Sequence, residues 1–360
     1  MKLTANIKLE CSTEQRKALL DTLEACNAAC NYISQKAWDT KTFGQFKLHA
    51  LVYHQIKDLF GLNAQMTVRS IAKVADAYKL DKKHIRKFRK HSAQPYDDRI
   101  FRLCVDNSIS ISALTGREKI NYQCGEYQRE LIKSRKGEVD LIYINKTFYL
   151  ACVCDVDEES IIDPEGILGI DLGIVNVAVD SEGKHYSGKD IEIYRKKMAN
   201  RRKNLQKKGT RSAKRKLKKI SHKQQRFQKD RNHCISKSIV ATAKRLSFSI
   251  ALEDLGGIRD GIKARKSQRA RMGNWSFYQL KSFIKYKAKL LGITVTEVDS
   301  RNTSRTCPQC NFVSKANRKT RDLFCCKQCG FSESADLVAA WNIQAKAVIN
   351  QPMVAEMMRA

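Results

Sequence analysis

Four cysteines in the last quarter of the chain have the spacing of a metal site. Two residues separate Cys307 from Cys310, fifteen residues follow, and two residues separate Cys326 from Cys329. Each close pair lets one tight turn present two sulfurs, and two such turns can enclose one ion in a tetrahedron. The spacing therefore predicts one structural zinc ion, with chance clustering among thirteen cysteines as the alternative. Cys325 is off this spacing and is not counted as a ligand.

Three acidic residues stand in otherwise apolar sequence, where a carboxylate is costly unless something pairs with it. Asp171 and Glu253 lie on apolar segments predicted to be strands, and Asp336 opens an apolar segment predicted to be a helix. Hard cations such as Mg2+ are the usual partners, bound through carboxylates and substrate phosphates. Two such ions about 3.5–4 Å apart would clamp the attacking and leaving oxygens of a phosphodiester. We therefore expect a two-Mg2+ phosphodiesterase centre.

Each acid also has a simpler interpretation. Asp171 can cap a turn, Glu253 can pair with a basic helix, and Asp336 can be an ordinary helix N-cap. Asp254, next to Glu253, is an equally plausible metal ligand. The combination of the three acids favours the metal centre.

Two stretches of the chain carry clustered positive charge. In Lys79–Lys90, seven Lys or Arg residues accompany one acid, and Phe88 lies among them. In Arg195–Arg231, eighteen Lys or Arg residues accompany one acid, and Gly209-Thr210 is predicted to separate two helices. Such clusters suit a nucleic-acid backbone, and an aromatic ring can stack on a base. A solvated surface is the alternative. The candidate contacts are Lys82, Lys83, Arg86, Lys87, Arg89, Lys196, Lys197, Arg201, Arg202, Arg211, Lys214, Arg215 and Arg231.

Composition points to the same class of partner. The formal net charge of +31 over 360 residues implies a polyanion, of which nucleic acid is the commonest. We see no signal peptide and no apolar run long enough to cross a membrane, so no membrane partner is expected. The cysteines lack the spacing of a disulfide scaffold, which favours a reducing compartment such as cytoplasm or nucleoid.

Periodicity predicts the elements that position these residues. Residues 11–91 read as helices, with a capping box at Ser12–Gln15 and buried Cys26 and Cys30. Residues 92–160 read as strands, with a turn at Lys136-Gly137 and core residues Cys152 and Cys154. The expected strands are 3–9, 101–105, 108–112, 139–143, 147–154, 167–173, 175–179, 248–255 and 292–298. The expected later helices include one with Trp275, Phe277, Leu280 and Phe283, after a basic loop at Arg259–Arg271, and one that starts at Asp336.

Three segments resemble the motifs of a RuvC nuclease split by a zinc ribbon, namely Gly169–Gly173, Ala251–Leu255 and Cys329–Ile343. Their order, with this chain length, is similar to the TnpB family of RNA-guided nucleases of insertion sequences, also known as OrfB transposases. The type V CRISPR effectors are larger relatives. The resemblance is densest from about Gly166 to Ile343.

The resemblance assigns roles to residues. Asp171, Glu253 and Asp336 match the catalytic acids, and the four cysteines match the ribbon, preceded by Thr303-Ser304. The region with Arg231 and His233 matches the helical stretch before the glutamate strand. Two positions depart from the pattern, because Val338 stands where the family commonly has Asn and Asn311 where it usually has Gly.

The resemblance also implies an α/β multidomain, bilobed fold. Residues 1–10 and 92–160 would form a β-barrel wedge domain, and 11–91 a helical recognition domain. An RNase H-like RuvC domain would span 161–300 and 333–360, with a basic helical hairpin at 190–235. Residues 301–332 would form the inserted zinc ribbon that binds target nucleic acid.

The implied function is an RNA-guided DNA endonuclease associated with a transposon in a prokaryotic cell. Its partners would be a guide RNA and double-stranded target DNA with a short flanking motif, bound by a monomer on one RNA. Three alternatives stay open at this point. They are a cleavage-deficient RNA-guided repressor, a strict DNA transposase and a miniature type V CRISPR effector.

Overall fold

The chain folds into two compact units, Met1–Asp157 and Glu158–Ala360. A computed structural model describes residues 1–256 and 276–357, with side chains to residue 349. The predicted basic loop Arg259–Arg271 and Trp275 lie outside the described residues. None of the helices described has both the length and the apolar character needed to span a bilayer.

The first unit is built on a seven-stranded antiparallel sheet with the order β2-β6-β7-β1-β5-β4-β3. The sheet is nearly closed, because the Tyr96 hydroxyl of β2 reaches the Ser112 carbonyl of β4 across 3.3 Å. A nearly closed sheet therefore lies in the part of the chain where a β-barrel is expected. The strands are β1 (Lys2–Glu10), β2 (Gln94–Tyr96), β3 (Phe101–Leu103), β4 (Ser108–Ala113), β5 (Gly116–Gln123), β6 (Arg135–Ile144) and β7 (Thr147–Asp155), and the short helix α4 (Glu126–Lys133) connects β5 to β6.

Three helices are inserted between β1 and β2 of this sheet. They are α1 (Thr13–Asp39), α2 (Gln45–Phe60) and α3 (Ala64–Leu80). The predicted capping box is confirmed, since Ser12 and Gln15 bond each other's backbone N–H groups. Cys26, Cys30, Cys152 and Cys154 are buried in one apolar core that unites the helices with the sheet. The predicted core role of these cysteines is therefore confirmed.

The predicted turn at Lys136-Gly137 is wrong. Both residues lie within β6, where the register to β7 shifts between Arg135 and Val139. Gly137 has φ 77°, a left-handed conformation that a bulge accommodates most easily with glycine. Glycine here marks a bulge in a continuous strand, and the sequence signal for a turn and for a bulge is the same.

The second unit contains a mixed five-stranded sheet with the order β10-β9-β8-β11-β12. Its central strands β8 and β11 run parallel, as do β11 and β12, whereas β9 is antiparallel to β8. Strands covered on both faces need continuous apolar sequence, which explains the buried runs of β8 and β11. The strands are β8 (Gly166–Asp171), β9 (Asn176–Asp180), β10 (His185–Ser187), β11 (Phe248–Asp254) and β12 (Val295–Asp299).

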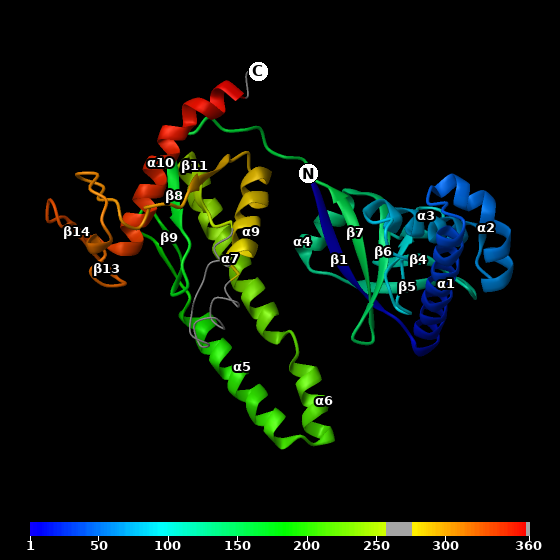
Figure 1. Cartoon of the computed structure of the whole chain (residues 1–360). Coiled ribbons are helices and arrows are strands. Elements are labelled where there is room, and N and C mark those ends of the chain that lie inside the picture. Colours follow the sequence, from blue (N-terminus) through cyan, green and yellow to red (C-terminus); the bar gives the residue numbers. More distant parts are fainter. Residues whose placement is uncertain (257–275, 358–360) are drawn as a thin grey trace. The chain divides into compact units, whose positions relative to one another are not determined.

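Helices cover both faces of this sheet (Figure 1). α7 (Lys223–Arg245) and α9 (Phe277–Leu290) pack on one face, and α10 (Ala335–Met357) packs against β8 on the other. The approach of α10 is close, because a Cβ added at Gly169 would lie 2.2 Å from the Ala340 carbonyl oxygen. Glycine at this position lets the helix lie directly on the strand that ends in Asp171.

A helical hairpin extends from this unit, formed by α5 (Lys189–Lys208) and α6 (Arg211–Ile220) and continuing into α7 (Figure 1). Gly209, with φ 63°, ends α5, and the Thr210 side chain caps α6, as predicted for Gly209-Thr210. Tyr194 of α5 stacks on Phe227 of α7, with ring centroids 4.3 Å apart. This stacked pair fixes the base of a hairpin that otherwise buries few apolar residues.

A small insert separates β12 from α10. It contains a short 3-10 helix at Lys315–Asn317, β13 (Leu323–Cys325) and β14 (Ser332–Ser334). Its apolar cluster joins Cys307, Phe324 and Cys326 to Ala335 and Val338 of α10. The insert therefore packs on the first turn of the helix that carries Asp336.

Candidate functional site

Asp171 and Glu253 are brought together by two parallel strands. In the register of β8 and β11, Ile170 pairs with Leu252, so Asp171 and Glu253 are the next residue of each strand. Burial raises the pKa of Asp171 to about 8, and the nearby negative charges of Glu253 and Asp336 add to this rise. Arg318 acts in the opposite direction. The three predicted acids therefore share one electrostatic site, although Asp336 is separated from both in sequence.

Glu253, and not Asp254, faces this site. The Glu253 side chain is buried, and the Thr303 hydroxyl donates a hydrogen bond to its Oε1. Burial raises the pKa of Glu253, and the bond from Thr303 opposes that rise. Asp254 is exposed, accepts from the Gly256 N–H at 2.9 Å and lies 3.5 Å from the Lys281 ammonium. Successive residues of a strand point to opposite faces, which separates the two acids.

Asp336 lies in the first turn of α10, which begins one residue earlier than predicted, at Ala335. Asn176 Nδ2 donates to Asp336 Oδ2 at 2.9 Å, and Arg318 Nη2 lies 3.5 Å from Oδ1. A carboxylate at a helix N-terminus is also favoured by the helix dipole. Val338, where the resemblance expects Asn, is buried in the cluster of the insert and makes no side-chain hydrogen bond to Asp336. Asn176 instead supplies the amide that holds Asp336.

A cavity of about 320 Å³ opens at this point. Asp171 and Asp336 line it, together with residues 172–176, Arg318 and Arg321. Glu253 does not line the cavity and is buried beside Thr303. Among the described residues, only the cysteine quartet has ligand atoms that all lie within 4.8 Å of one another, so the three carboxylates are spaced more widely than this. The pocket thus combines two acids with two cations supplied by the insert.

The four cysteines form one compact cluster. Cys307 Sγ lies 3.6 Å from Cys329 Sγ, and Cys310 Sγ lies 3.5 Å from Cys326 Sγ. Four sulfurs at a Zn–S distance of about 2.3 Å would be about 3.8 Å apart in a tetrahedron, so the quartet fits zinc. Cys325 is not part of the group, as predicted.

The two turns that present the cysteines are built alike. In each turn, the residue after the second cysteine has a left-handed backbone, with φ 58° at Asn311 and φ 74° at Gly330. Asn311 N–H donates to the Cys307 carbonyl at 2.9 Å, and Gly330 N–H to the Cys326 carbonyl at 3.1 Å. Asparagine tolerates this conformation better than most residues. The departure from glycine at Asn311 therefore preserves the turn.

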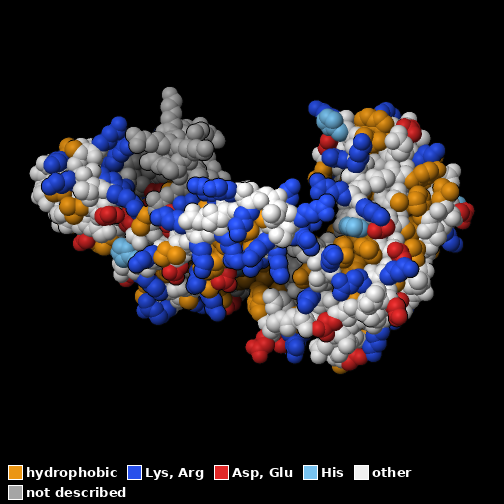
Figure 2. All heavy atoms as spheres, turned by 90° about the horizontal axis from the view of Figure 1, so that it is seen from below, with side chains coloured by type: hydrophobic (Ala, Val, Ile, Leu, Met, Phe, Trp, Pro, Cys, Tyr) orange, Lys and Arg blue, Asp and Glu red, His pale blue; other side chains and the backbone are white. Residues whose placement is uncertain are grey.

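The predicted basic residues lie mostly on the surface. Lys82, Lys83, Lys87 and Arg89 are exposed after α3, whereas Arg86 is half-buried and pairs with Asp81 at 3.3 Å. Phe88 packs against the core of the first unit, and the Lys73 ammonium lies 5.2 Å from its ring centre. The candidates on α5, α6 and α7 are all exposed, and blue Lys and Arg side chains outnumber red acidic ones on the face in Figure 2. Those exposed candidates are Lys196, Lys197, Arg201, Arg202, Arg211, Lys214, Arg215 and Arg231.

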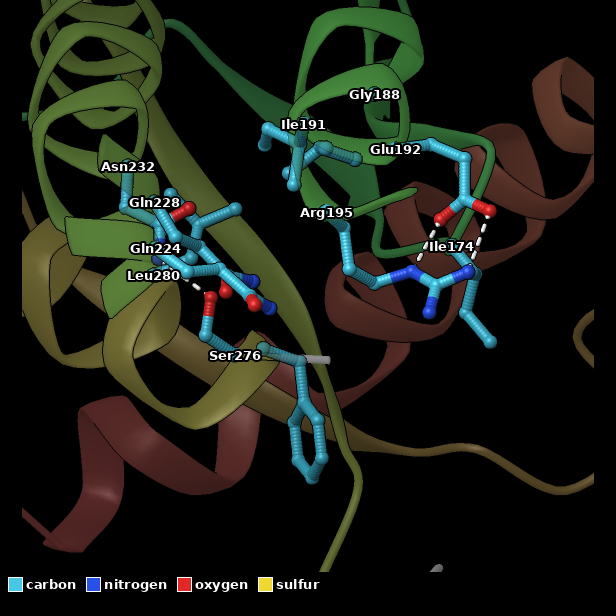
Figure 3. Close-up of a pocket in the computed structure, with 12 residues that line it drawn as sticks. Ile174, Gly188, Ile191, Glu192, Arg195, Gln224, Gln228, Asn232, Ser276 and Leu280 are labelled. Atoms are coloured by element: carbon cyan, nitrogen blue, oxygen red, sulfur yellow. Dashed lines mark hydrogen bonds and ion pairs between the residues drawn. The ribbon is translucent and has the colours of Figure 1, made fainter. Parts of the chain in front are cut away.

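A second, smaller cavity of about 40 Å³ lies where α5, α7 and α9 meet (Figure 3). On one side, Arg195 makes two hydrogen bonds to the carboxylate of Glu192, at 2.7 and 2.8 Å. On the other, Asn232 donates to the Ser276 hydroxyl at 2.7 Å, in line with Gln224 and Gln228 on the same face of α7. None of the predicted acids lines this cavity. We interpret this cavity as a small packing gap in the contact that attaches the hairpin to the rest of the second unit.

Sequence reasoning missed several residues of the acidic site. Asn176, Arg318 and Arg321 carry no local signal, because their partners come from segments far away in the chain. Thr303 was noted only as part of Thr303-Ser304. Fifty positions of sequence separate Thr303 from Glu253, so no local spacing pattern predicts their contact.

Two family models match this chain. The model described as "Probable transposase" matches residues 152–255, and the model described as "Cas12f1-like, TNB domain" matches residues 277–343. The first range contains Asp171 and Glu253, and the second contains the cysteine quartet and Asp336. Together with the relatives below, the matches support a TnpB-type protein related to the type V effectors.

Curated relatives agree with this TnpB-type assignment. The chain is 28% identical over 242 residues to the TnpB-like protein MJ0751 of Methanocaldococcus jannaschii, covering 62% of the chain and 84% of that protein. It is 30% identical to the CRISPR-associated endodeoxyribonuclease Cas12f1 of Syntrophomonas palmitatica over 52% of the chain, and 33% to that of Sulfoacidibacillus thermotolerans over 54%. It spans only 40% and 49% of the length of these two nucleases.

Structure comparison extends the likeness to most of this TnpB-type chain. A cryo-EM structure described as the Cas12f1–sgRNA–target DNA complex superimposes with a TM-score of 0.61 at 17% identity. The match covers 91% of this chain and 82% of that one. The two proteins therefore share a fold.

Proposed function

We propose that this TnpB-type protein is an RNA-guided DNA endonuclease of transposon origin. The observation that carries the proposal is the convergence of Asp171, Glu253 and Asp336, in which burial and the two neighbouring charges raise the pKa of Asp171 to about 8. Perturbed carboxylates beside an open cavity mark candidate catalytic sites. The relatives named as endodeoxyribonucleases, and the fold shared with a guide-RNA and target-DNA complex, favour DNA cleavage over other phosphodiester chemistry.

The topology of the second unit supports an RNase H-like RuvC domain. Its mixed sheet carries the acids at the ends of the adjacent parallel strands β8 and β11 and at the start of the helix that covers them. Parallel strands place their carboxyl ends at the same edge of a sheet, where sites of α/β folds form. In this assignment residues 301–332 are the inserted ribbon, and the first unit supplies the wedge and recognition regions.

The acid pocket fits Mg2+ by the chemistry of its donors. Asp171 lies near the negative charges of Glu253 and Asp336, which Arg318 offsets only in part, and a hard divalent cation bound through oxygen would stabilise this group of carboxylates. Asp171, Glu253 and Asp336 would hold two such ions, which supply activated water and stabilise the leaving oxygen. Asn176 holds Asp336 in the pocket, and Thr303 holds Glu253 beside it. Arg318 and Arg321 line the same cavity and suit a DNA phosphate there.

The cysteine quartet would hold one structural zinc ion. All four positions are occupied by protein sulfur, so no ligand position is left for catalysis. Zinc would fix the insert that presents Arg318 and Arg321 to the pocket. Zinc therefore has a positional role in this proposal, whereas the carboxylates carry the cutting.

The exposed basic surfaces fit the two nucleic-acid partners. A guide RNA and a heteroduplex are held mainly through their phosphates, which the Lys and Arg residues of α5, α6 and α7 are suited to contact. Base pairing would read the target, and the protein would read a short flanking motif in double-stranded DNA. We propose that one chain acts on one RNA in the prokaryotic cytoplasm or nucleoid.

The test is to purify the chain with its co-expressed locus, sequence the RNA that accompanies it, and supply labelled DNA that matches this guide. Cleavage of the matched duplex with Mg2+, no cleavage with EDTA and no cleavage of a scrambled duplex support the proposal. Binding without cleavage in Mg2+ would instead identify a repressor, and joined DNA ends would identify a strict transposase. CRISPR repeats in the bound RNA would identify a miniature CRISPR effector.

A further inference from the structure

We propose that Thr303 is a positioning residue for Glu253, and that the segment leading into the cysteine cluster thereby sets the geometry of the acidic pocket. This inference rests on the proposed nuclease function, because it assigns Glu253 to the catalytic site. It concerns a residue that no motif for the acids includes. The contact joins a side chain of β11 to one that comes four positions before Cys307.

The contact itself is buried on both sides. The exposed fraction is 3% for Thr303 and 7% for Glu253, and the Thr303 hydroxyl donates to Glu253 Oε1. A hydrogen bond to a carboxylate is stronger in a water-poor site than at the surface, and it fixes the oxygen that accepts it. The other Glu253 oxygen is thereby left for a cation. Thr303 thus fixes one of the two Glu253 oxygens beside the pocket and leaves the other without a side-chain donor among the described residues.

The Thr303 hydroxyl has a second acceptor. Its oxygen lies 3.0 Å from the Ser300 carbonyl, which can only accept a hydrogen bond. A hydroxyl has one proton and can rotate, so this proton bonds either Glu253 or the Ser300 carbonyl. The bond to the Glu253 carboxylate is charge-assisted and therefore the stronger of the two, so the hydroxyl stays on Glu253 when a cation binds the other carboxylate oxygen.

Thr303 is in turn held by α10. Asn342 Nδ2 donates to the carbonyls of Thr303 and Thr306, at 2.7 and 2.8 Å, and Asn342 is buried. Lys346, four residues further along the same helix face, donates to the Asp299 carbonyl at 2.9 Å and also to that of Arg301. These two side chains fix residues 299–306 from end to end.

The same helix begins with the third acid. α10 therefore carries Asp336 in its first turn and, through Asn342, fixes the loop that positions Glu253. The cysteine insert begins at Cys307, directly after this loop, and ends at Ala335, where α10 starts. The loop contacts Glu253 and the first turn of α10 carries Asp336, so each end of the insert lies next to the position of a different acid. A folded insert therefore holds the loop and α10 in fixed positions relative to each other. This couples the fold of the insert to the geometry of the acidic site.

The experiment compares three variants of the full chain with its bound RNA. Thr303→Val removes the hydroxyl at equal size, and Thr303→Ser retains it. Thr306→Val is the matched control, because the Thr306 hydroxyl donates to the Asn302 carbonyl at 2.9 Å in the same loop. The readouts are Mn2+ affinity by calorimetry, zinc content and the rate of DNA cleavage.

Loss of a group that orients a metal ligand typically costs about 10–100-fold in metal affinity. We expect Thr303→Val to weaken Mn2+ binding by about tenfold or more at unchanged zinc content, with a matching rise in the Mg2+ needed for half-maximal cleavage. Thr303→Ser should restore both, and Thr306→Val should change neither.

The inference is overturned if Thr303→Val binds Mn2+ as the unaltered chain does, or if Thr306→Val has the same effect. The failure of the proposed function gives a different result. If the unaltered chain binds Mn2+ in a Thr303-dependent manner but cuts no DNA, the coupling stands and the nuclease assignment falls.

Discussion

The side-chain amide of Asn176 donates a hydrogen bond to the carboxylate of Asp336 at 2.9 Å, although 160 positions of sequence separate the two residues. This bond joins the first residue of β9 to the first turn of α10, so the edge of the sheet and the covering helix hold the third acid together. An amide donor orients the carboxylate without neutralising its charge. Asp336 is therefore a candidate metal ligand whose direction is set by a strand.

Replacing Asn176 with alanine should slow DNA cleavage by about 10–100-fold, the range typical for losing a group that orients a metal ligand. Binding of the matched DNA should be unchanged, because Asn176 contacts the acid within the protein. Single-turnover cleavage and a filter-binding assay measure the two effects. Asn204→Ala, on the exposed face of α5, is the control and should cut normally. Equal rates for Asn176→Ala and the control would contradict the assignment.

The alanine variants of Asp171, Glu253 and Asp336 should each reduce cleavage to background and leave DNA binding nearly intact. Each variant removes a proposed metal ligand, while the surfaces proposed to hold nucleic acid are unchanged. Asp254→Ala is the matched control, since Asp254 lies next to Glu253 but faces Lys281. Cutting of labelled target DNA in Mg2+ gives the result. Normal cutting by any of the three acid variants would remove that residue from the centre, and loss of cutting in Asp254→Ala would show that the ligand is wrongly assigned.

Sequence predicted the parts of the site that have a local pattern. An acid in an apolar segment marks Asp171 and Glu253, and paired C-x2-C spacing marks the four clustered cysteines. Arg318 and Asn176 could not be found in this way, because each is an ordinary polar residue until folding brings it to Asp336. The strand β5 was missed for a related reason, since only Ile120 of its eight residues is buried and the rest are polar or exposed. The bulge at Gly137 read as a turn because both need the same backbone.

Asp171→Asn should stabilise the protein in buffer without divalent cations, and more strongly at pH 8 than at pH 5. The pKa of Asp171 is raised to about 8 in the folded chain from an ordinary 3.8. Below pH 3.8 the carboxyl is neutral in both states, and its contribution to stability is lost as pH rises through about 8. The variant has no such charge to bury. For a unit of this size, each kcal/mol corresponds to about 2–4 °C in Tm.

Thermal melts of both proteins at pH 5 and pH 8 measure this difference. Asp254→Asn is the control, and its expected effect on stability is the opposite. The Gly256 N–H and then Lys281 hold the pKa of Asp254 below its usual range, so the Asp254 charge favours the folded state. Loss of the Asp254 charge should therefore not raise Tm at pH 8. Added Mg2+ should raise the Tm of the unaltered chain but not that of Asp171→Asn. A Tm gap that is the same at both pH values would contradict the raised pKa.

Substitution of Cys307 or Cys326 by serine should lower zinc content to below one ion per chain. Both side chains are buried in the cluster that packs on α10, so their loss should also lower the melting temperature. Elemental analysis of the purified protein measures zinc. Cys325→Ser, adjacent in sequence but outside the quartet, should keep one zinc per chain. Stoichiometric zinc in the Cys307 or Cys326 variant would exclude this ligand set.

The double substitution Lys214→Ala and Arg215→Ala should weaken RNA binding without changing the cleavage rate of DNA once the complex has formed. Both residues are exposed on α6, and neither makes an ion pair with a residue that the structure describes. Removing a side chain that binds one phosphate should reduce the slope of log affinity against log salt concentration by about 1. Titration of the guide RNA at several salt concentrations gives this slope. Lys133→Ala is the control, because Lys133 pairs with Glu130 at 2.7 Å on α4 and should leave the slope unchanged. An unchanged slope in the double variant would mean that this face of α6 does not contact the RNA backbone.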